Sequence, residues 1–168
     1  MWEGKNVTVF VTGGIAAFKA ATLVRLFVKA GANVEVAMTK SACEFITPLT
    51  FQVLTKNKVH TDTFDEDEAD LVQHIHLADK TDVAVVVPAT ANTIAKLANG
   101  IADNFVTSTL LATTAPIYVA PAMNEHMWEN PATVRNVAQL KADGKVIIEP
   151  ATGFLAEGYN GKGRLPEP

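Results

Sequence analysis

The chain has 168 residues, of which 48% are hydrophobic and 19% charged, and its formal net charge is −4 at pH 7, as expected for one globular domain rather than a disordered chain. The negative balance offers no basic stripe for nucleic acid, and no apolar run approaches the ~20 residues needed to cross a membrane. Because Cys43 is the only cysteine, no disulfide or thiolate cluster can form within the chain, which fits a soluble protein of the reducing cytoplasm.

The first part of the chain predicts two buried strands with a helix between them. Val7 to Thr12 is almost entirely β-branched or apolar and ends at Gly13-Gly14, as a buried parallel strand does before a turn. A helix is expected over Ala16 to Ala30, where apolar residues recur every three or four positions and Gly31 follows as the stop. The next strand is expected at Asn33 to Met38.

The remaining chain continues this alternation. Short helices are expected after Thr39 and around Leu49 to Leu54, and the acidic run from Asp65 to Asp70 is expected to be a solvated loop. Alternating strands and helices predict a single-domain, doubly wound parallel sheet of the α/β class, Rossmann-like or flavodoxin-like, with helices on both faces. The further strands are Val83 to Val87, Ile117 to Val119 and Val146 to Ile148, and the further helices are Ile94 to Leu97, Phe105 to Leu111 and Thr133 to Ala142.

Four polar or glycine- and proline-rich junctions follow the predicted strands. Ligands of open parallel sheets bind outside the carboxyl ends of the strands, so we expect the junctions to converge on one edge. The Gly13-Gly14 turn can direct backbone N–H groups and a helix dipole at a phosphate, or be a plain turn; it lacks the third glycine of the dinucleotide motif, which disfavours NAD. The junctions are Thr12 to Gly14, Met38 to Ser41, Pro88 to Asn92 and Pro121 to Asn124.

The last two junctions each have a second explanation. Thr90 or Asn92 would also serve as the N-cap of the helix that follows. Met123, Met127 and a nearby tryptophan suit the apolar wall of a ligand pocket with one polar group, Asn124; they equally suit a core in which Asn124 caps a short helix.

Two histidines and the glycine-rich end of the chain complete the candidates. His74 and His76 stand two residues apart, as on one face of a strand, which suits either a metal site with an acidic third ligand or one acid–base histidine beside a surface one. The tail from Gly153 to Arg164 has four glycines in twelve positions and is expected to be mobile, as a lid over an anionic substrate or as a frayed terminus.

Five strings in this order resemble the homo-oligomeric flavin-containing cysteine decarboxylases over essentially the whole chain. Within that family they look like the phosphopantothenoylcysteine decarboxylase branch. The strings are Gly13 to Ala17, His74 to Leu77, Pro88 to Thr93, Pro121 to Asn124 with Met127-Trp128, and the glycine-rich tail.

The resemblance implies FMN at the carboxyl edge of the sheet and decarboxylation of 4′-phosphopantothenoylcysteine to 4′-phosphopantetheine, on the way to coenzyme A. It implies His74 as the catalytic histidine, Asn124 with Met123 at the substrate, Lys162 or Arg164 at its phosphate, and no metal. The FMN-binding residues would be Gly13, Gly14, Ile15, Thr39, Ser41, Pro88, Ala89, Thr90 and Asn92.

At the level of the whole protein, the resemblance implies a homotrimer that can build a dodecamer, with sites between subunits. Residues 1–168 would form the flavin-binding decarboxylase domain, with residues 152–168 as a mobile substrate clamp. Many relatives continue into a fused synthetase domain where this chain stops.

The tail departs from the family at one position. Many relatives have a cysteine between Ala156 and Gly158, where this chain has Glu157, so Glu157 or Tyr159 is expected to supply the proton of the reductive step. The alternatives are a peptidyl-cysteine decarboxylase that stops at an aminoenethiol, a flavin prenyltransferase, and a non-catalytic flavoprotein regulatory subunit. The intact His74 and Asn124 favour the decarboxylase.

Overall fold

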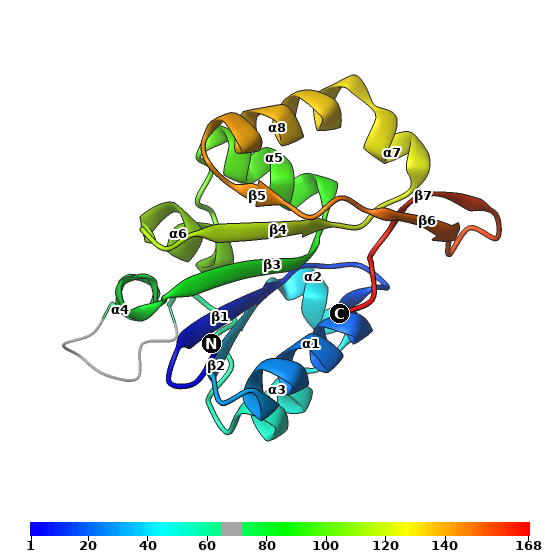
Figure 1. The fold of residues 1–168 in the computed structure, drawn as a ribbon. Coiled ribbons are helices and arrows are strands. Elements are labelled where there is room, and N and C mark those ends of the chain that lie inside the picture. Colours follow the sequence, from blue (N-terminus) through cyan, green and yellow to red (C-terminus); the bar gives the residue numbers. More distant parts are fainter. Residues whose placement is uncertain (65–71) are drawn as a thin grey trace.

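A five-stranded parallel sheet forms the centre of the computed structural model, which describes residues 1–64 and 72–168 (Figure 1). The strands are β1 (Asn6–Val11), β2 (Asn33–Met38), β3 (Val83–Ala89), β4 (Ile117–Pro121) and β5 (Val146–Ile147). Their order is β2-β1-β3-β4-β5, and every neighbouring pair is parallel. This is the flavodoxin-like order of a doubly wound sheet, so the predicted fold class is confirmed.

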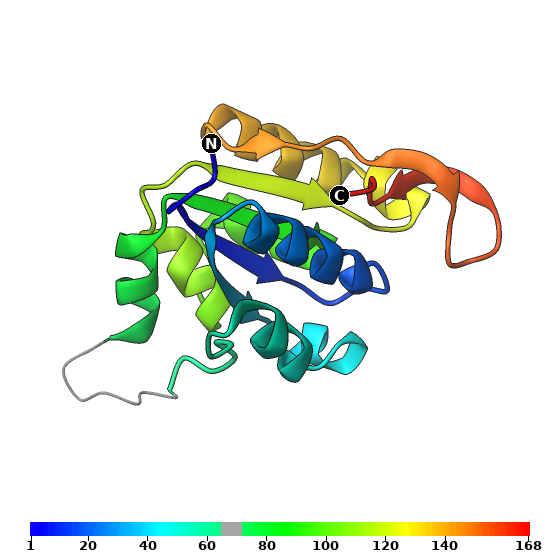
Figure 2. The ribbon, with the colours of Figure 1, turned by 60° about the horizontal axis from the view of Figure 1, so that its bottom comes forward.

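Helices cover both faces of this sheet (Figures 1 and 2). One face carries α1 and α3, and the other carries α4, α5, α6 and α8. None of the described helices is long and apolar enough to cross a membrane. The helices are α1 (Ala17–Lys29), α2 (Lys40–Phe45), α3 (Pro48–Thr55), α4 (Gln73–Lys80), α5 (Ala91–Asn99), α6 (Phe105–Ala112), α7 (Glu125–Glu129) and α8 (Pro131–Ala142).

The alternation of side chains along the strands creates two cores. Val9 of β1 is fully buried against α1, where it packs in one cluster with Ala20 and Val24. The next residue, Phe10, points to the opposite face and packs with Ile94 of α5 in the second cluster. Successive strand residues point to opposite faces, so apolar residues at nearly every position are required to fill both cores.

Two segments differ from the sequence-based expectation. His74 to Leu77 was expected as a strand, but it lies in helix α4, where Leu77 and Ala78 face the core. The tail forms an antiparallel hairpin of β6 (Ala151–Phe154) and β7 (Asn160–Arg164), which was not predicted. The expected acidic loop from Asp65 to Asp70 lies outside the described residues.

Candidate functional site

A cleft of about 1030 Å³ lies at the carboxyl ends of the strands and is lined by residues from all four predicted junctions. It includes the ends of β1 and β3, where the order of a doubly wound sheet reverses and ligands bind. The predicted site residues that line it are Gly13, Gly14, Ile15, Thr39, Ser41, Thr90, Asn92, Met123, Asn124, Glu157 and Arg164.

Five other predicted residues, Tyr159 among them, do not line the cleft. Pro88 and Ala89 lie behind its surface: the Pro88 carbonyl accepts a 2.5 Å hydrogen bond from Thr12 Oγ1, and Ala89 is fully buried. Lys162 lies 5.9 Å from the Trp128 ring centroid and 3.6 Å from a Glu149 oxygen. His74 is considered separately below.

The turn between β1 and α1 brings the backbone close to the cleft. A Cβ on Gly13 would lie 2.5 Å from Ser41 Cβ, so only glycine allows α2 to pack against this turn. The first turn of α1 borders the cleft, and its N-cap residue, Ala16, provides no side-chain acceptor. Ala17 N and Lys19 N donate to the backbone carbonyls of Gly14 and Ala16, and the positive end of the helix dipole makes this terminus suitable for a phosphate.

Hydroxyl groups cap two further helices that begin at the cleft, α2 and α5. Thr39 Oγ1 accepts a hydrogen bond from Ala42 N, and Thr90 Oγ1 accepts one from Thr93 N, each at 3.1 Å. The N-cap explanation for Thr90 is therefore correct, although the residue also lines the cleft. Hydroxyls in these positions can also bind a polyol or phosphate.

Part of the cleft lining is apolar and exposed to solvent. Ile15, Phe18 and Phe154 are 65%, 61% and 64% exposed, and Met123 and Met127 lie with them around the cleft. Large exposed apolar side chains around a cleft are typical of a surface that a flat ligand or a second subunit covers.

Asn124 is held between a helix and the hairpin. Its Oδ1 accepts a 2.8 Å hydrogen bond from His126 N, so Asn124 is the N-cap of α7. This is one of the two explanations that the sequence suggested for Asn124. Its Nδ2 donates a 2.7 Å hydrogen bond to the Tyr159 hydroxyl. The cap orients the amide, so that its NH₂ group is directed to the hairpin.

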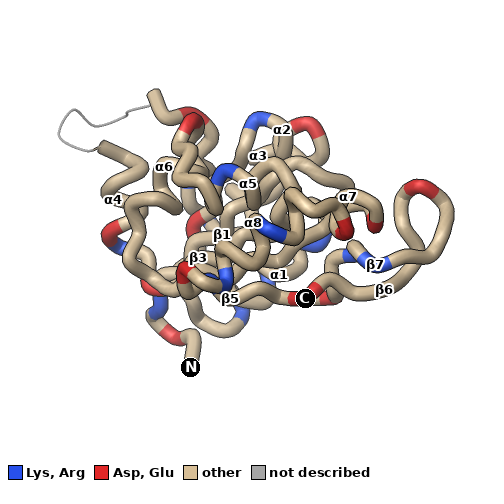
Figure 3. Tube along the Cα trace, turned by 90° about the horizontal axis from the view of Figure 1, so that it is seen from above, with Lys and Arg blue, Asp and Glu red and all other residues tan. Residues whose placement is uncertain are grey.

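The hairpin is docked onto the core through backbone and side-chain contacts. Met123 N donates to Gly163 O at 2.9 Å, and Lys162 N donates to Glu125 Oε1 at 3.4 Å. Further along, the buried Lys19 ammonium donates to Leu165 O at 2.7 Å. Figure 3 shows the positive charge on β7 and the negative charge at the hairpin tip. Of its two cations, Arg164 is the one that lines the cleft.

His74 lies behind one wall of the cleft. Its ring is 6.4 Å from that of Phe105, which does line the cleft, and His60 stacks on Phe105 at 4.9 Å. The buried His74 Nδ1 has no hydrogen-bond partner among the described residues. Because α4 is a helix, His74 and His76 point about 200° apart rather than to one face.

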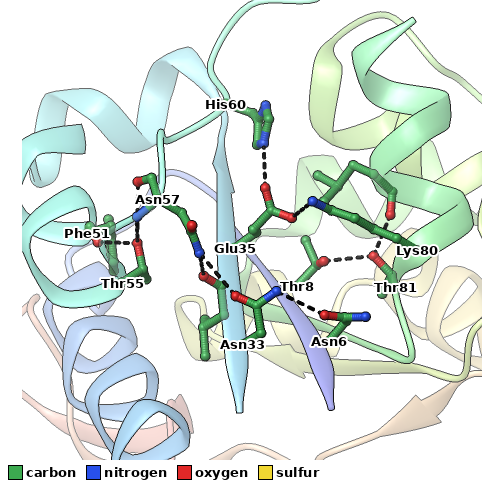
Figure 4. Close-up of polar contacts among 12 residues, drawn as sticks. Asn6, Thr8, Asn33, Glu35, Phe51, Thr55, Asn57, His60, Lys80 and Thr81 are labelled. Atoms are coloured by element: carbon green, nitrogen blue, oxygen red, sulfur yellow. Dashed lines mark hydrogen bonds and ion pairs between the residues drawn. The ribbon is translucent and has the colours of Figure 1, made fainter. Parts of the chain in front are cut away.

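Glu35 anchors helix α4 to the sheet (Figure 4). One carboxylate oxygen lies 3.2 Å from His60 Nε2, and the other pairs with Lys80 at the end of α4. Burial opposes ionisation, but the hydrogen bonds and charges of His60 and Lys80 outweigh it and hold the pKa of the Glu35 carboxyl below its ordinary value. The same contact positions His60 on Phe105.

The described residues contain no group of three histidine, cysteine or acidic side chains placed to hold a metal ion. The acidic run considered as the source of a third ligand lies outside the described residues. Phe105 and Lys19 line the cleft although the sequence analysis did not select them. For Lys19 a signal was present, because it is a charged residue within the apolar helix that follows Gly14.

Comparison with known proteins agrees with this architecture. The Flavoprotein family matches residues 1–168, and the chain belongs to that family. It is 55% identical to the coenzyme A biosynthesis bifunctional protein CoaBC of Bacillus subtilis, covering 100% of this chain but 41% of that protein. It is 46% identical to the probable phosphopantothenoylcysteine decarboxylase of Streptococcus mutans, covering 97% of this chain and 92% of that protein.

Two solved structures share the fold. The FMN-dependent cysteine decarboxylase SpaF matches with a TM-score of 0.86 and 33% identity, over 96% of this chain and 92% of that one. A C175S mutant of a PPC decarboxylase, complexed with pantothenoylaminoethenethiol, matches with a TM-score of 0.87 and 34% identity, over 98% of this chain and 92% of that one.

Proposed function

We propose that this chain binds FMN in the cleft and decarboxylates 4′-phosphopantothenoylcysteine to 4′-phosphopantetheine, a step in coenzyme A biosynthesis. The observation that carries the proposal is the meeting, in one cleft, of an uncapped helix terminus, small hydroxyl side chains and the Met123-Asn124 segment. The relative from Streptococcus, which this chain covers almost completely, supports the same reaction. Arg164 at the cleft is placed to bind an anionic group of the substrate, such as its phosphate.

The residues present suit a flavin mononucleotide. The Gly13-Gly14 turn and the α1 terminus would hold the phosphate, with Ser41 beside them, and Thr39, Thr90 and Asn92 would face the polar chain. The exposed apolar side chains around the cleft would cover the ring. When bound, the flavin supplies a two-electron acceptor and later returns the electrons.

The substrate needs this electron acceptor because it has no group of its own that can stabilise the product of decarboxylation. Direct loss of carbon dioxide from a cysteinyl carboxylate would leave an unstabilised carbanion at Cα. Oxidation of the Cβ–S unit to a thioaldehyde places a C=S bond next to Cα, so the electron pair left by carbon dioxide is delocalised as an enethiolate. The protein's task is then to bind, to orient and to move protons.

We assign these tasks to two residues. His74 accepts the thiol proton, and Asn124 holds the carboxylate through its amide. His74 does not line the cleft of its own subunit, which supports its acting in the cleft of a neighbour. We therefore propose a trimer with sites between subunits, which can assemble into a dodecamer, and residues 152–168 as the clamp over the substrate.

The first test is to incubate the purified, FMN-loaded protein with 4′-phosphopantothenoylcysteine and follow product masses by mass spectrometry. We expect loss of carbon dioxide and formation of 4′-phosphopantetheine over many turnovers. No change in mass would overturn the proposal, and turnover of a peptide with a C-terminal cysteine instead would establish the peptidyl-cysteine reaction.

Two variants in the same helix test the role of His74. His74→Asn should lower turnover on the order of 10²-fold or more, the range typical of a lost acid–base group. The matched control is His76→Asn, at an exposed position of α4, which should keep turnover near the wild-type level. Equal activity of the two variants would remove His74 from the mechanism.

A further inference from the structure

The proposed reaction takes up one proton at carbon, and the donor is a separate question from the oxidation. Replacing a carboxylate by hydrogen consumes one proton for each carbon dioxide released. In the proposed sequence this proton reaches Cα of the enethiolate, after carbon dioxide has left. The donor must therefore lie beside the group that holds the carboxylate, which we have assigned as Asn124.

Tyr159 occupies that place in the structure. Its hydroxyl oxygen lies 2.7 Å from Asn124 Nδ2 and accepts the amide hydrogen. Asn124 Oδ1 already accepts a hydrogen bond from His126 N, so the amide meets the phenol through its NH₂ group. The phenol is thus held by an N–H donor while its own proton stays available for transfer.

The turn of the hairpin fixes the backbone of Tyr159. Leu155 N donates to Tyr159 O at 2.8 Å, and Gly158 N donates to Leu155 O at 3.0 Å. The docking contacts of Met123 with Gly163 and of Glu125 with Lys162 hold the same hairpin against the segment that carries Asn124. The Tyr159–Asn124 pair is therefore supported from both of its elements.

We propose that Tyr159 is the catalytic acid that protonates Cα of the enethiolate, with Asn124 stabilising the phenolate that forms; this rests on the proposed function. In this step the O–H bond of Tyr159 breaks and a C–H bond forms at Cα. The Cα=Cβ electron pair is used for that bond, and the sulfur lone pair forms C=S. Reduction of the resulting thioaldehyde at Cβ would use the two electrons that a bound flavin supplies, and solvent reprotonates the phenolate.

The chemistry of the two side chains at the hairpin tip favours Tyr159 over Glu157. Glu157 lines the cleft and is exposed. Of the two side chains, the Tyr159 side chain is the one that shares a hydrogen bond with Asn124.

The test separates carbon dioxide release from saturation of the product under anaerobic conditions, with Tyr159→Phe in the FMN-loaded protein. We expect first-turnover carbon dioxide release to stay close to wild type, and formation of 4′-phosphopantetheine to fall on the order of 10²-fold. The product should instead be the enethiol, two hydrogens lighter, together with flavin that stays bleached. Tyr118→Phe, on strand β4, is the matched control for loss of a phenolic hydroxyl.

Three outcomes contradict the proposal. Unchanged product from Tyr159→Phe would remove the residue from the reaction, and loss of saturation in Glu157→Gln alone would assign the acid to Glu157. An equal fall in carbon dioxide release and saturation would indicate a structural role, since that is the effect of an undocked hairpin. Failure of the wild-type protein to release carbon dioxide would instead refute the proposed function.

Discussion

At the scale of single residues, Glu35 is the charge on which the position of α4 depends. Its side chain is 13% exposed, and it contacts two nitrogen groups from different parts of the chain, the His60 ring and the Lys80 ammonium. A carboxylate in this setting loses solvation, which the two donors replace. The same contact places His60 against Phe105, and Phe105 against His74. A change at Glu35 should therefore affect the surroundings of His74, although Glu35 does not contact His74.

Glu35→Gln should lower the free energy of unfolding by about 1–3 kcal/mol at neutral pH, the usual range for a hydrogen bond to a charged group. The pKa of the Glu35 carboxyl is lowered in the folded protein, so its contribution is present above the ordinary carboxyl range near pH ~4.3 and is lost as the pH falls through the lowered value. Urea unfolding of both proteins between neutral and acidic pH measures this.

A surface carboxylate provides the comparison. Glu149 also contacts two cations, Lys141 and Lys162, but its side chain is 52% exposed. Glu149→Gln should cost less than about 1 kcal/mol because water already solvates the pair. If the two variants lose equal stability, burial of Glu35 is not the source of its effect.

At the scale of elements, the docking of the hairpin depends on Gly163. Its φ is +140°, and a Cβ there would lie 2.0 Å from the Met123 carbonyl oxygen. Gly163→Ala should therefore separate β7 from the Met123 segment. Trypsin should cut after Lys162 and Arg164 on the order of 10-fold faster, which corresponds to opening made easier by about 1.4 kcal/mol.

Gly158→Ala is the control within the same hairpin. Gly158 also has a positive φ, +94°, but no heavy atom lies within 4 Å of the position of its Cβ. This variant has the backbone strain of alanine without the collision. Faster cleavage in Gly163→Ala than in Gly158→Ala would identify the contact with Met123 as the cause, and similar rates would contradict it.

The sequence predicted the elements that are defined by local patterns. Buried strands such as β2 and β3 were found because both of their faces are covered, so they appear as continuous apolar runs. Helix α4 was mistaken for a strand because four residues cannot distinguish a period of two from 3.6, and its N-cap, Val72, carries no capping side chain. The hairpin was missed because its glycines are held by long-range contacts, not by strand propensity.

The cleft was predictable to a similar degree. Junctions at the ends of parallel strands must meet at one edge, so the places of Gly13, Thr39 and Thr90 followed from fold class alone. The fold class did not predict the contacts between elements that are distant in the sequence. Neither the hydrogen bond from Asn124 to Tyr159 nor the stacking of His60 on Phe105 has a spacing or motif that a single sequence reveals.

At the scale of the whole molecule, the described surface has features that a single subunit leaves unsatisfied. Ile15 and Phe18 are exposed at the cleft, and Leu49 of α3 is 62% exposed. Apolar side chains gathered in this way are typical of an interface. The buried Nδ1 of His74 has no partner among the described residues, and a buried ring nitrogen without a hydrogen bond is costly. A neighbouring subunit would cover the exposed apolar side chains.

Subunit mixing tests this arrangement directly. We expect His74→Asn and Asn124→Ala each to be inactive alone, because each removes one half of the proposed site. If the site joins His74 of one subunit to Asn124 of the next, a head-to-tail ring of both variants contains intact sites, about a quarter of the total for random mixing. Co-expressed variants, purified together through two tags, should therefore recover activity. If both residues serve the same subunit, every mixed site stays defective and the hybrid is as inactive as its parents.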